Sequence, residues 1–379
     1  MSLRHTPATV LLVLASSCSG IVSDDGFDGD LDNTSIAIVG VNVVPMDRSG
    51  TLDAQTVLIA DGRITAIGPS STTEVPSDAL RINGTGKYLI PGLIDMHVHI
   101  RSADLKQYLG AGVTSVRNMG GYEKLPDLIR DVDEKVTLGP RIFSLSASFD
   151  GSPGVSQDAQ LADDPKVVAS LVNRQYDLGY REIKVYTNLP RSSYDSVVAV
   201  ARRKGMTWAG HVPTAVGLTR ALESGQRSIE HLGGYTPGST LAAQVAATVK
   251  AGTYNCPTLA VQRWFSSSQW FPQLMGIVSA LHSSGARLLV GTDSGIGFTQ
   301  PGESVHAELE LFVDSGLTPY EALRAATTTG SEYLGQASAI GTIEVGKEAD
   351  LVLLGGNPLA DIRAVRNIDV VILDGRVLR

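Results

Sequence analysis

The stretch that decides the fold is Tyr88-Leu-Ile-Pro-Gly-Leu-Ile-Asp-Met-His-Val-His99, which ends in the pair His97 and His99. Its apolar residues predict a buried strand that carries both histidines to its carboxyl end. Residues two apart in a strand point the same way, so both imidazoles can reach one ion. Imidazole is a common ligand for zinc and similar divalent ions. A His-x-His pair also occurs on ordinary edge strands, so further ligands must decide the interpretation.

Four further candidate ligands follow, each at the end of a short apolar run: Lys184, His211, His231 and Asp293. In a (β/α)8 TIM-type barrel the carboxyl ends of successive parallel strands converge on one mouth, where catalytic groups collect. Between residues 90 and 340, strand-like runs alternate with helical ones, which is the pattern of such a barrel. The sequence therefore predicts one site built from six side chains.

Lys184 differs from the other five candidates, because its ammonium group would repel a metal ion. Its neutral amine can react with carbon dioxide to form a carbamate, which carries two oxygens and a negative charge. Such an anion can bridge two metal ions. An ordinary solvated lysine is the alternative for Lys184 taken alone, and its place in the ordered set favours the ligand.

At these positions the chain resembles the amidohydrolase superfamily, over nearly all of its length after about residue 35. The flanking motifs look like the imidazolonepropionase-related subgroup, which includes prolidase-like and Xaa-Arg dipeptidases. These motifs are Pro91-Gly-Leu-Ile-Asp-Met-His, Ile183-Lys-Val-Tyr, Gly210-His-Val-Pro, Ile229-Glu-His-Leu and Gly291-Thr-Asp-Ser-Gly. The family pattern is His-x-His after strand one, a carboxylated Lys after strand four, His after strands five and six, and Asp after strand eight. The residues that fill it are His97, His99, Lys184, His211, His231 and Asp293.

The resemblance implies two divalent metal ions, with zinc expected, bridged by carboxylated Lys184. His97 and His99 would hold the more buried ion together with Asp293, and His211 and His231 the more exposed one. A hydroxide shared by the ions would attack a carbonyl carbon, since bound metals lower the pKa of water and polarise carbonyl groups. Asp293 would also take up the proton and pass it to the leaving nitrogen.

Two more residues are candidates for catalysis. Tyr186 lies two positions after Lys184, so in a strand it faces the same mouth and can donate a hydrogen bond to the oxyanion. His306, in Ser304-Val-His-Ala-Glu-Leu309, resembles a histidine that follows strand eight in the subgroup, where it would orient Asp293 or contact substrate. A packing role is the alternative for each.

The ends of the chain predict a second, smaller unit. Residues 36–89 alternate short β-rich runs with turn signals, Asp61-Gly62 and Asn83-Gly84 among them, and residues 341–379 repeat that style. Two β segments at opposite ends most simply pair into one β-sandwich domain, with the barrel of residues 90–340 inserted between them. Thr318-Pro-Tyr-Glu321 predicts the start of the last barrel helix, with Thr as N-cap and Pro in the first turn.

Composition agrees with a globular enzyme. The chain has 379 residues, 43% of them hydrophobic, which is enough for a barrel and a smaller module. The net charge of −8 and the absence of a basic stripe argue against nucleic acid as a partner. A small molecule or a dipeptide is the expected substrate, and a homo-oligomer stays open.

Residues 1–18 have the layout of a secretory signal, with Arg4 before the apolar run Ala8–Ala15 and small residues after it. Cys18 resembles the lipidated cysteine of a bacterial lipoprotein, although Ala15 stands where leucine is usual. Residues 19–35 are rich in Asp, Gly and Ser and predict a flexible tether. We therefore expect export to the bacterial periplasm or cell envelope, with Cys18 as a candidate lipid anchor.

Three functions remain open from the sequence. The first is a metal-dependent hydrolase of a C–N amide bond in a dipeptide or N-acyl amino acid. The second is a hydrolase of a cyclic amide, a lactone or another small metabolite. The third is an inactive barrel that serves as an envelope binding protein, which the intact set of six ligands disfavours. The first two cannot be separated, because specificity resides in loops that carry no readable motif.

Overall fold

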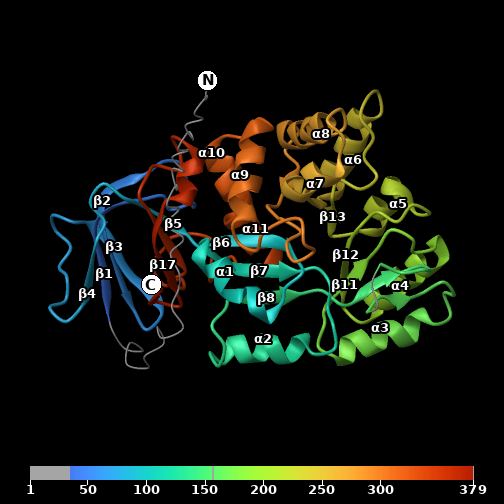
Figure 1. Ribbon diagram of the computed structural model, residues 1–379, viewed down its shortest axis with the longest axis horizontal. Helices are drawn as coiled ribbons and strands as arrows, with labels where there is room; N and C mark the ends of the chain where they lie inside the picture. Colours follow the sequence, from blue (N-terminus) through green and yellow to red (C-terminus); the bar gives the residue numbers. More distant parts are fainter. Residues whose placement is uncertain (1–34, 156–157, 379) are drawn as a thin grey trace, which may run out of the picture.

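The computed structural model describes residues 35–155 and 158–378 (Figure 1). The predicted signal segment, tether and Cys18 lie outside these ranges. The described chain combines parallel sheets flanked by helices with a separate β-rich end, so the α/β class is confirmed. Within the described residues no helix has the length and apolar character needed to cross a bilayer.

Strands from both ends of the chain form one eight-stranded sheet, in the order β18-β17-β16-β5-β1-β2-β3, with β4 pairing to β1. Strands from the two ends of the chain thus pair directly, and hydrogen bonds run through them as one continuous sheet. Its strands are β1 (Ile36–Val43), β2 (Leu52–Ala60), β3 (Arg63–Pro69), β4 (Leu80–Asn83), β5 (Tyr88–Pro91), β16 (Leu351–Leu354), β17 (Ile368–Leu373) and β18 (Arg376–Leu378).

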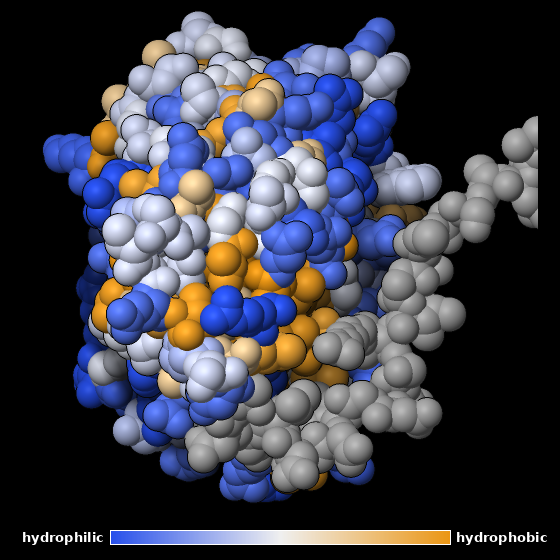
Figure 2. Space-filling view, turned by 90° about the vertical axis from the view of Figure 1, so that its left-hand side faces the viewer, coloured by the Kyte–Doolittle hydropathy of each residue, from blue (hydrophilic) through white to orange (hydrophobic). Residues whose placement is uncertain are grey.

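This sheet has its own hydrophobic core, which draws on β1, β2, β3, β5, β16 and β17. Figure 2 looks onto this end of the molecule and shows a hydrophobic patch at the centre of a mostly hydrophilic face. Half-buried residues packed against the core include Leu52, Ile67 and Ile82. The β-rich end is thus stabilised by its own burial of apolar surface.

One of the two predicted hairpin turns is confirmed and the other is wrong. Asp61 and Gly62 both have positive φ, as a two-residue turn requires, and they join the antiparallel strands β2 and β3. By contrast, β4 and β5 both run parallel to β1, so Asn83-Gly84 does not close a hairpin. Gly84 is needed for another reason, because a Cβ there would lie 2.5 Å from Cβ of Val41.

Parallel strands occupy the middle of the chain in two sheets. The three-stranded sheet contains β6 (Leu93–Val98), β7 (Val113–Asn118) and β8 (Arg141–Ser144). The seven-stranded sheet has the order β10-β9-β11-β12-β13-β14-β15. Its strands are β9 (Ser148–Asp150), β10 (Gln160–Leu161), β11 (Glu182–Val185), β12 (Thr207–Gly210), β13 (Ser228–Glu230), β14 (Tyr254–Cys256) and β15 (Arg287–Leu288).

Backbone hydrogen bonds link the two parallel sheets at both of their edges. On one side, the amide of Ser146, between β8 and β9, donates to the carbonyl of Glu182 at 2.9 Å. On the other side, the amide of Met96 in β6 donates to the carbonyl of Val290 at 2.8 Å, and Val98 forms a parallel bridge with Ser294. The carboxyl end of β6 therefore lies beside the segment that carries Asp293.

Helices alternate with these strands and cover them from outside (Figure 1). The helix predicted to begin at Thr318 is confirmed, since the Thr318 hydroxyl accepts from the Glu321 amide while the Glu321 carboxylate accepts from the Thr318 amide. The helices are α1 (Leu105–Gly110), α2 (Leu125–Asp133), α3 (Val168–Asp177), α4 (Arg191–Arg203), α5 (Gly217–Ser224), α6 (Leu241–Ala251), α7 (Leu259–Phe265), α8 (Phe271–Ser283), α9 (Ser304–Asp314), α10 (Pro319–Ala325) and α11 (Thr328–Leu334), with 3-10 turns η1 (Ser102–Asp104) and η2 (Ile362–Arg366).

Candidate metal centre

The end of β6 places His97 and His99 against Asp293. Nε2 of His97 lies 3.3 Å from Oδ1 of Asp293, and Nε2 of His99 lies 3.2 Å from the same oxygen. Both histidines point the same way from the strand, as the His-x-His spacing predicts.

Lys184 extends from β11 into the same region and is fully buried. Its Nζ has no hydrogen-bond partner among the described residues. Burial lowers the pKa of the Lys184 amine to about 8, so the neutral amine is accessible near physiological pH. A neutral amine is the form that carboxylation by carbon dioxide requires.

His211 and His231 follow β12 and β13 and lie next to each other, with ring centroids 4.7 Å apart. The His231 ring is also 4.7 Å from that of His97, and its Nδ1 is 4.0 Å from Oδ2 of Asp293. Burial lowers the pKa of His231 to about 3 and that of His211 well below its usual value. Both rings are therefore neutral, as metal ligation requires.

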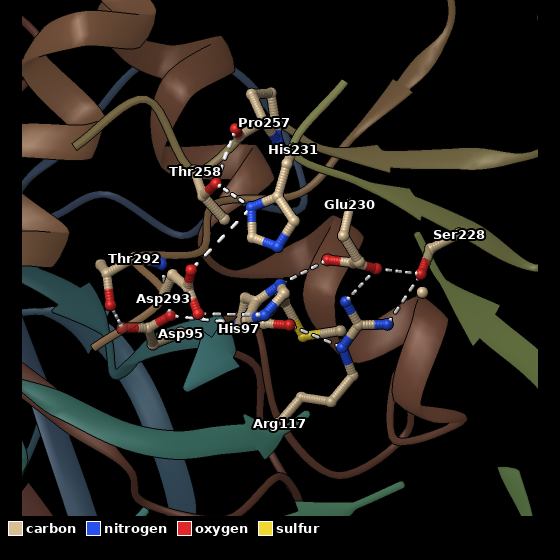
Figure 3. A network of polar contacts seen from close by, with 12 residues as sticks. Asp95, His97, Arg117, Ser228, Glu230, His231, Pro257, Thr258, Thr292 and Asp293 are labelled. Atoms are coloured by element: carbon tan, nitrogen blue, oxygen red, sulfur yellow. Dashed lines mark hydrogen bonds and ion pairs between the residues drawn. The ribbon is translucent and has the colours of Figure 1, made fainter. Parts of the chain in front are cut away.

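Hydroxyl groups hold the rings of these two histidines from behind. Nδ1 of His211 lies 2.7 Å from the Thr187 hydroxyl, and Nδ1 of His231 lies 2.7 Å from the Thr258 hydroxyl. Thr258 donates its own hydrogen to the carbonyl of Pro257 at 2.7 Å (Figure 3). Thr258 must therefore accept from His231, which leaves Nε2 of that ring without a proton.

The backbone at the centre adopts conformations that most residues avoid. His231, Thr258 and Asp293 all have φ between 51° and 59°, in the left-handed region. Such residues cluster at functional sites, where the surrounding structure holds them in place. Glycine is needed nearby for close approach: a Cβ at Gly291 would lie 2.4 Å from Sγ of Cys256 and 2.8 Å from Cβ of His97.

A cavity of about 370 Å³ opens over the six residues. All six line it, and so does Tyr186, whose ring stacks on that of His211 with centroids 3.9 Å apart. Burial raises the pKa of Tyr186 to about 12, so its hydroxyl keeps its proton and can donate. Arg101 and Tyr122 add polar groups to the wall, and Ile100 and Ile296 add apolar ones. Such a cavity suits a small-molecule substrate.

His306 does not reach this cavity. It is buried in α9, and its Nε2 is hydrogen-bonded to the carbonyl of Ala111 at 2.9 Å. Because a carbonyl only accepts, Nε2 carries the proton and is fully engaged. The expectation that His306 orients Asp293 or contacts substrate is therefore corrected, and His306 packs α9 against the end of α1.

The donor set fits divalent metal ions. Ligand atoms of His97, His231 and Asp293 lie within 4.8 Å of one another. Three buried nitrogens of the centre have no hydrogen bond among the described residues: Nε2 of His97, Nζ of Lys184 and Nε2 of His211. Burying a polar atom in this way costs free energy unless another group binds it. Imidazole and carboxylate are preferred zinc ligands. The number and identity of the ions follow only as a proposal below.

Sequence reasoning missed the polar residues behind the ligands. Asp95 accepts from the Thr292 hydroxyl at 2.6 Å and from the backbone amide of His97 at 3.2 Å, which ties β6 to the segment before Asp293 (Figure 3). Glu230 accepts from His97 and from Arg117, and all three are buried. Burial raises the pKa of the Glu230 carboxyl, yet Arg117 and His97 hold it well below its usual range. The sequence signal that could have revealed Asp95 and Glu230 is a charged residue inside an apolar strand.

Fold and centre together define a class: an α/β protein with histidine and carboxylate side chains, candidates for binding a cation, gathered at the carboxyl ends of parallel strands. The chain belongs to the amidohydrolase family, whose model matches residues 88–378. The resemblance seen in the sequence is thus confirmed. This is a family of hydrolases that act on C–N bonds and generally bind metal ions.

Individual relatives are distant and span most of the chain. An ochratoxinase of Aspergillus niger is 23% identical, over 88% of this chain and 84% of the relative. An imidazolonepropionase of Geobacillus kaustophilus is 22% identical, over 90% of this chain and 95% of the relative. A crystal structure of a Xaa-Pro dipeptidase with methionine bound in its active site has a TM-score of 0.77 at 22% identity, over 91% of this chain and 99% of that one. At this identity the structural likeness concerns the fold.

Proposed function

We propose that the protein is a metal-dependent amidohydrolase that cleaves a C–N amide bond in a dipeptide or an N-acyl amino acid. The observation that carries the proposal is the meeting of His97, His231 and Asp293 within 4.8 Å, beside the Lys184 amine, which has no hydrogen-bond partner in the described part of the chain. Membership of the amidohydrolase family supports it. The substrate class is supported by the likeness to a Xaa-Pro dipeptidase and to an ochratoxinase.

All six side chains would hold metal, and Asp293 would also move a proton. His97, His99, Lys184, His211, His231 and Asp293 would hold two divalent ions, with zinc expected. When bound, the ions would lower the pKa of water and polarise the scissile carbonyl. Lys184 would first lose its proton and form an N–C bond to carbon dioxide, releasing a second proton and leaving a carbamate with two oxygens.

Asp293 has the position of a proton shuttle. Its carboxylate lines the cavity, so it can accept a proton from attacking water. It would then return that proton to the leaving nitrogen. The protonated hydroxyl of Tyr186 lines the same cavity and would donate to the oxyanion.

We also propose that the parallel strands close into a (β/α)8 barrel over residues 90–340, with residues 36–89 and 341–379 as the β-sandwich domain. The backbone bonds at both sheet edges support closure, since β8 leads directly into β9 and β6 pairs beside Val290 and Ser294. Eight parallel strands would then surround the centre, counting β8 and β9 as one and leaving β10 outside.

A second candidate function is hydrolysis of a cyclic amide or lactone. The likeness to an imidazolonepropionase over 95% of that relative favours it. An inactive binding protein gains no support from a cavity that all six candidate ligands line.

Metal content and activity test the proposal together. Protein produced with zinc and bicarbonate should contain close to two divalent ions per chain, because six ligands surround one cavity. It should hydrolyse members of a dipeptide and N-acyl amino acid library, and chelation should abolish turnover. Elemental analysis and the library screen measure this. A metal content near zero in folded protein would refute the mechanism, and turnover of cyclic amides or lactones alone would favour the second function.

We propose further that the protein is exported and anchored through a lipid on Cys18. The support is the sequence layout alone, with an apolar run followed by Ser16, Ser17 and Cys18. The full chain should sediment with membranes and partition into detergent, and Cys18→Ser should release it to the soluble fraction. Cytoplasmic recovery of an unprocessed chain that starts at Met1 would contradict export.

A further inference from the structure

A carboxylate stands directly behind one histidine of the centre. Glu230 is fully buried, and its Oε2 lies 2.7 Å from Nδ1 of His97 (Figure 3). Its other oxygen accepts from Nη2 of Arg117 at 2.9 Å and from the Ser228 hydroxyl. Three donors therefore surround Glu230, one of them a permanently charged guanidinium, which makes it an ionised acceptor.

This contact fixes the protonation of the His97 ring. Because Glu230 only accepts, His97 must donate through Nδ1, and in the neutral ring Nε2 then carries a lone pair. That Nε2 is fully buried, lies 3.3 Å from Oδ1 of Asp293 and makes no hydrogen bond to any described residue. Two acceptor atoms that face each other at this distance suit a cation that both can bind.

His211 and His231 have hydroxyl groups behind their rings in place of a carboxylate at hydrogen-bond distance. His231 donates to the hydroxyl of Thr258, and His211 contacts the hydroxyl of Thr187. A hydroxyl is a neutral group, so it polarises an imidazole less than a carboxylate does. The centre is therefore electrostatically unequal, with the extra negative charge on the His97 side.

Arg117 makes the buried charge of Glu230 tolerable. Its Nε donates to the carbonyl of Met96 at 2.6 Å, its Nη1 donates to the Ser228 hydroxyl at 3.0 Å, and its guanidinium lies over the ring of Tyr333 at 4.6 Å. With the guanidinium held in this way, its Nη2 engages one oxygen of Glu230 and leaves the other to His97. The arrangement thus compensates the charge without displacing the imidazole.

We propose that Glu230 is a positioning residue that holds His97 in the tautomer with the proton on Nδ1 and makes the metal position served by His97 the tighter of two. The inference rests on the proposed function, because it requires bound metal ions. A carboxylate behind a ligating histidine raises the basicity of the ring, and loss of such a partner typically costs about 10- to 100-fold in metal affinity.

Glu230→Gln tests the proposal, since it keeps the shape of the side chain and removes the charge. Competition of the purified protein with a chromophoric zinc chelator resolves the two binding steps. We expect the tighter step to weaken by about 10- to 100-fold, while the looser step changes by less than about 3-fold. Thr187→Val removes the hydroxyl behind His211 and should weaken only the looser step.

Glu182→Gln is the matched control. Glu182 is also buried, pairs with Arg227 at 3.4 Å and accepts from the Tyr333 hydroxyl at 2.9 Å. Within the described part of the chain its side chain contacts no histidine of the centre by hydrogen bond or ion pair. Both variants remove one buried carboxylate that is paired with an arginine beside Tyr333. The control should lower the thermal unfolding temperature and leave both zinc affinities unchanged.

The outcomes separate three cases. If Glu230→Gln lowers the unfolding temperature but leaves both zinc steps as in the wild type, Glu230 only balances Arg117 and the proposal is overturned. If the wild-type protein binds no zinc, the proposed function itself fails before any variant is compared. Should Glu230→Gln not fold, nitrogen NMR of histidine-labelled, metal-free wild-type protein replaces it. A downfield proton on Nδ1 of His97 is then expected, and a proton on Nε2 instead would overturn the proposal.

Discussion

Asp293→Asn is expected to lower turnover by about 100- to 10,000-fold while the zinc content falls only modestly. Asparagine keeps the size of the side chain and one oxygen ligand, but it has no basic carboxylate to accept a proton. The wild-type side chain is placed for both tasks, because its Oδ1 lies 3.3 Å and 3.2 Å from the Nε2 atoms of His97 and His99 and the residue lines the cavity. Steady-state kinetics and elemental analysis of the same preparation give the two quantities.

His99→Asn separates the ligand role of Asp293 from its proton transfer. This change removes a ligand and no base, so excess zinc should restore much of the turnover that is lost. Excess zinc should not restore the turnover of Asp293→Asn. If Asp293→Asn with its metals bound kept near-normal turnover, proton transfer would belong to another group. Tyr186 would be tested first, because His306 is engaged by the carbonyl of Ala111 outside the cavity.

Lys184→Ala is expected to lower zinc occupancy and to lower turnover by at least about 100-fold. Removal of a residue that only supports a metal ligand costs up to about 100-fold, and Lys184 would be a ligand itself. Lys184 is fully buried and its Nζ has no hydrogen-bond partner in the described part of the chain, so truncation empties the space where a carbamate would stand. A short carboxylic acid fits that space and supplies two oxygens and a charge. Acetate or propionate should therefore restore part of the activity, measured as turnover against acid concentration.

Lys184→Arg is the control for this rescue. Arginine keeps a positive charge and fills the space, and its guanidinium does not form a carbamate. We expect the same loss of activity without any rescue by acid. If the acid restored turnover in neither variant and Lys184→Ala kept its full zinc occupancy, Lys184 would be an ordinary buried lysine.

The sequence predicted those parts of the molecule that depend on local spacing. His97 and His99 share a face because a strand alternates its side chains, and Lys184, His211, His231 and Asp293 each end an apolar run that becomes a parallel strand or its extension. The start of α10 follows from residues three apart and is equally local. Such features need no knowledge of distant contacts.

Features that depend on distant contacts could not be predicted. Glu230 and Arg117 are 113 positions apart and meet only inside the folded strands. Asn83-Gly84 has the composition of a hairpin turn, yet the path of β4 and β5 along β1 overrides that preference. His306 has the expected spacing after strand eight, but the packing of α9 turns its ring to the carbonyl of Ala111.

The pairing of β5 with β16 has a consequence for biosynthesis. A ribosome makes β5 long before β16, so the edge formed by Tyr88–Pro91 stays open while the whole intervening segment is translated. An open edge offers unpaired amides and carbonyls to neighbouring nascent chains. The amide of Gly92, which leads into β6, also finds its acceptor only on Asp350. The bond that fixes the start of this strand therefore forms among the last steps of chain synthesis, and protein released before that point lacks this tether next to the strand that carries His97.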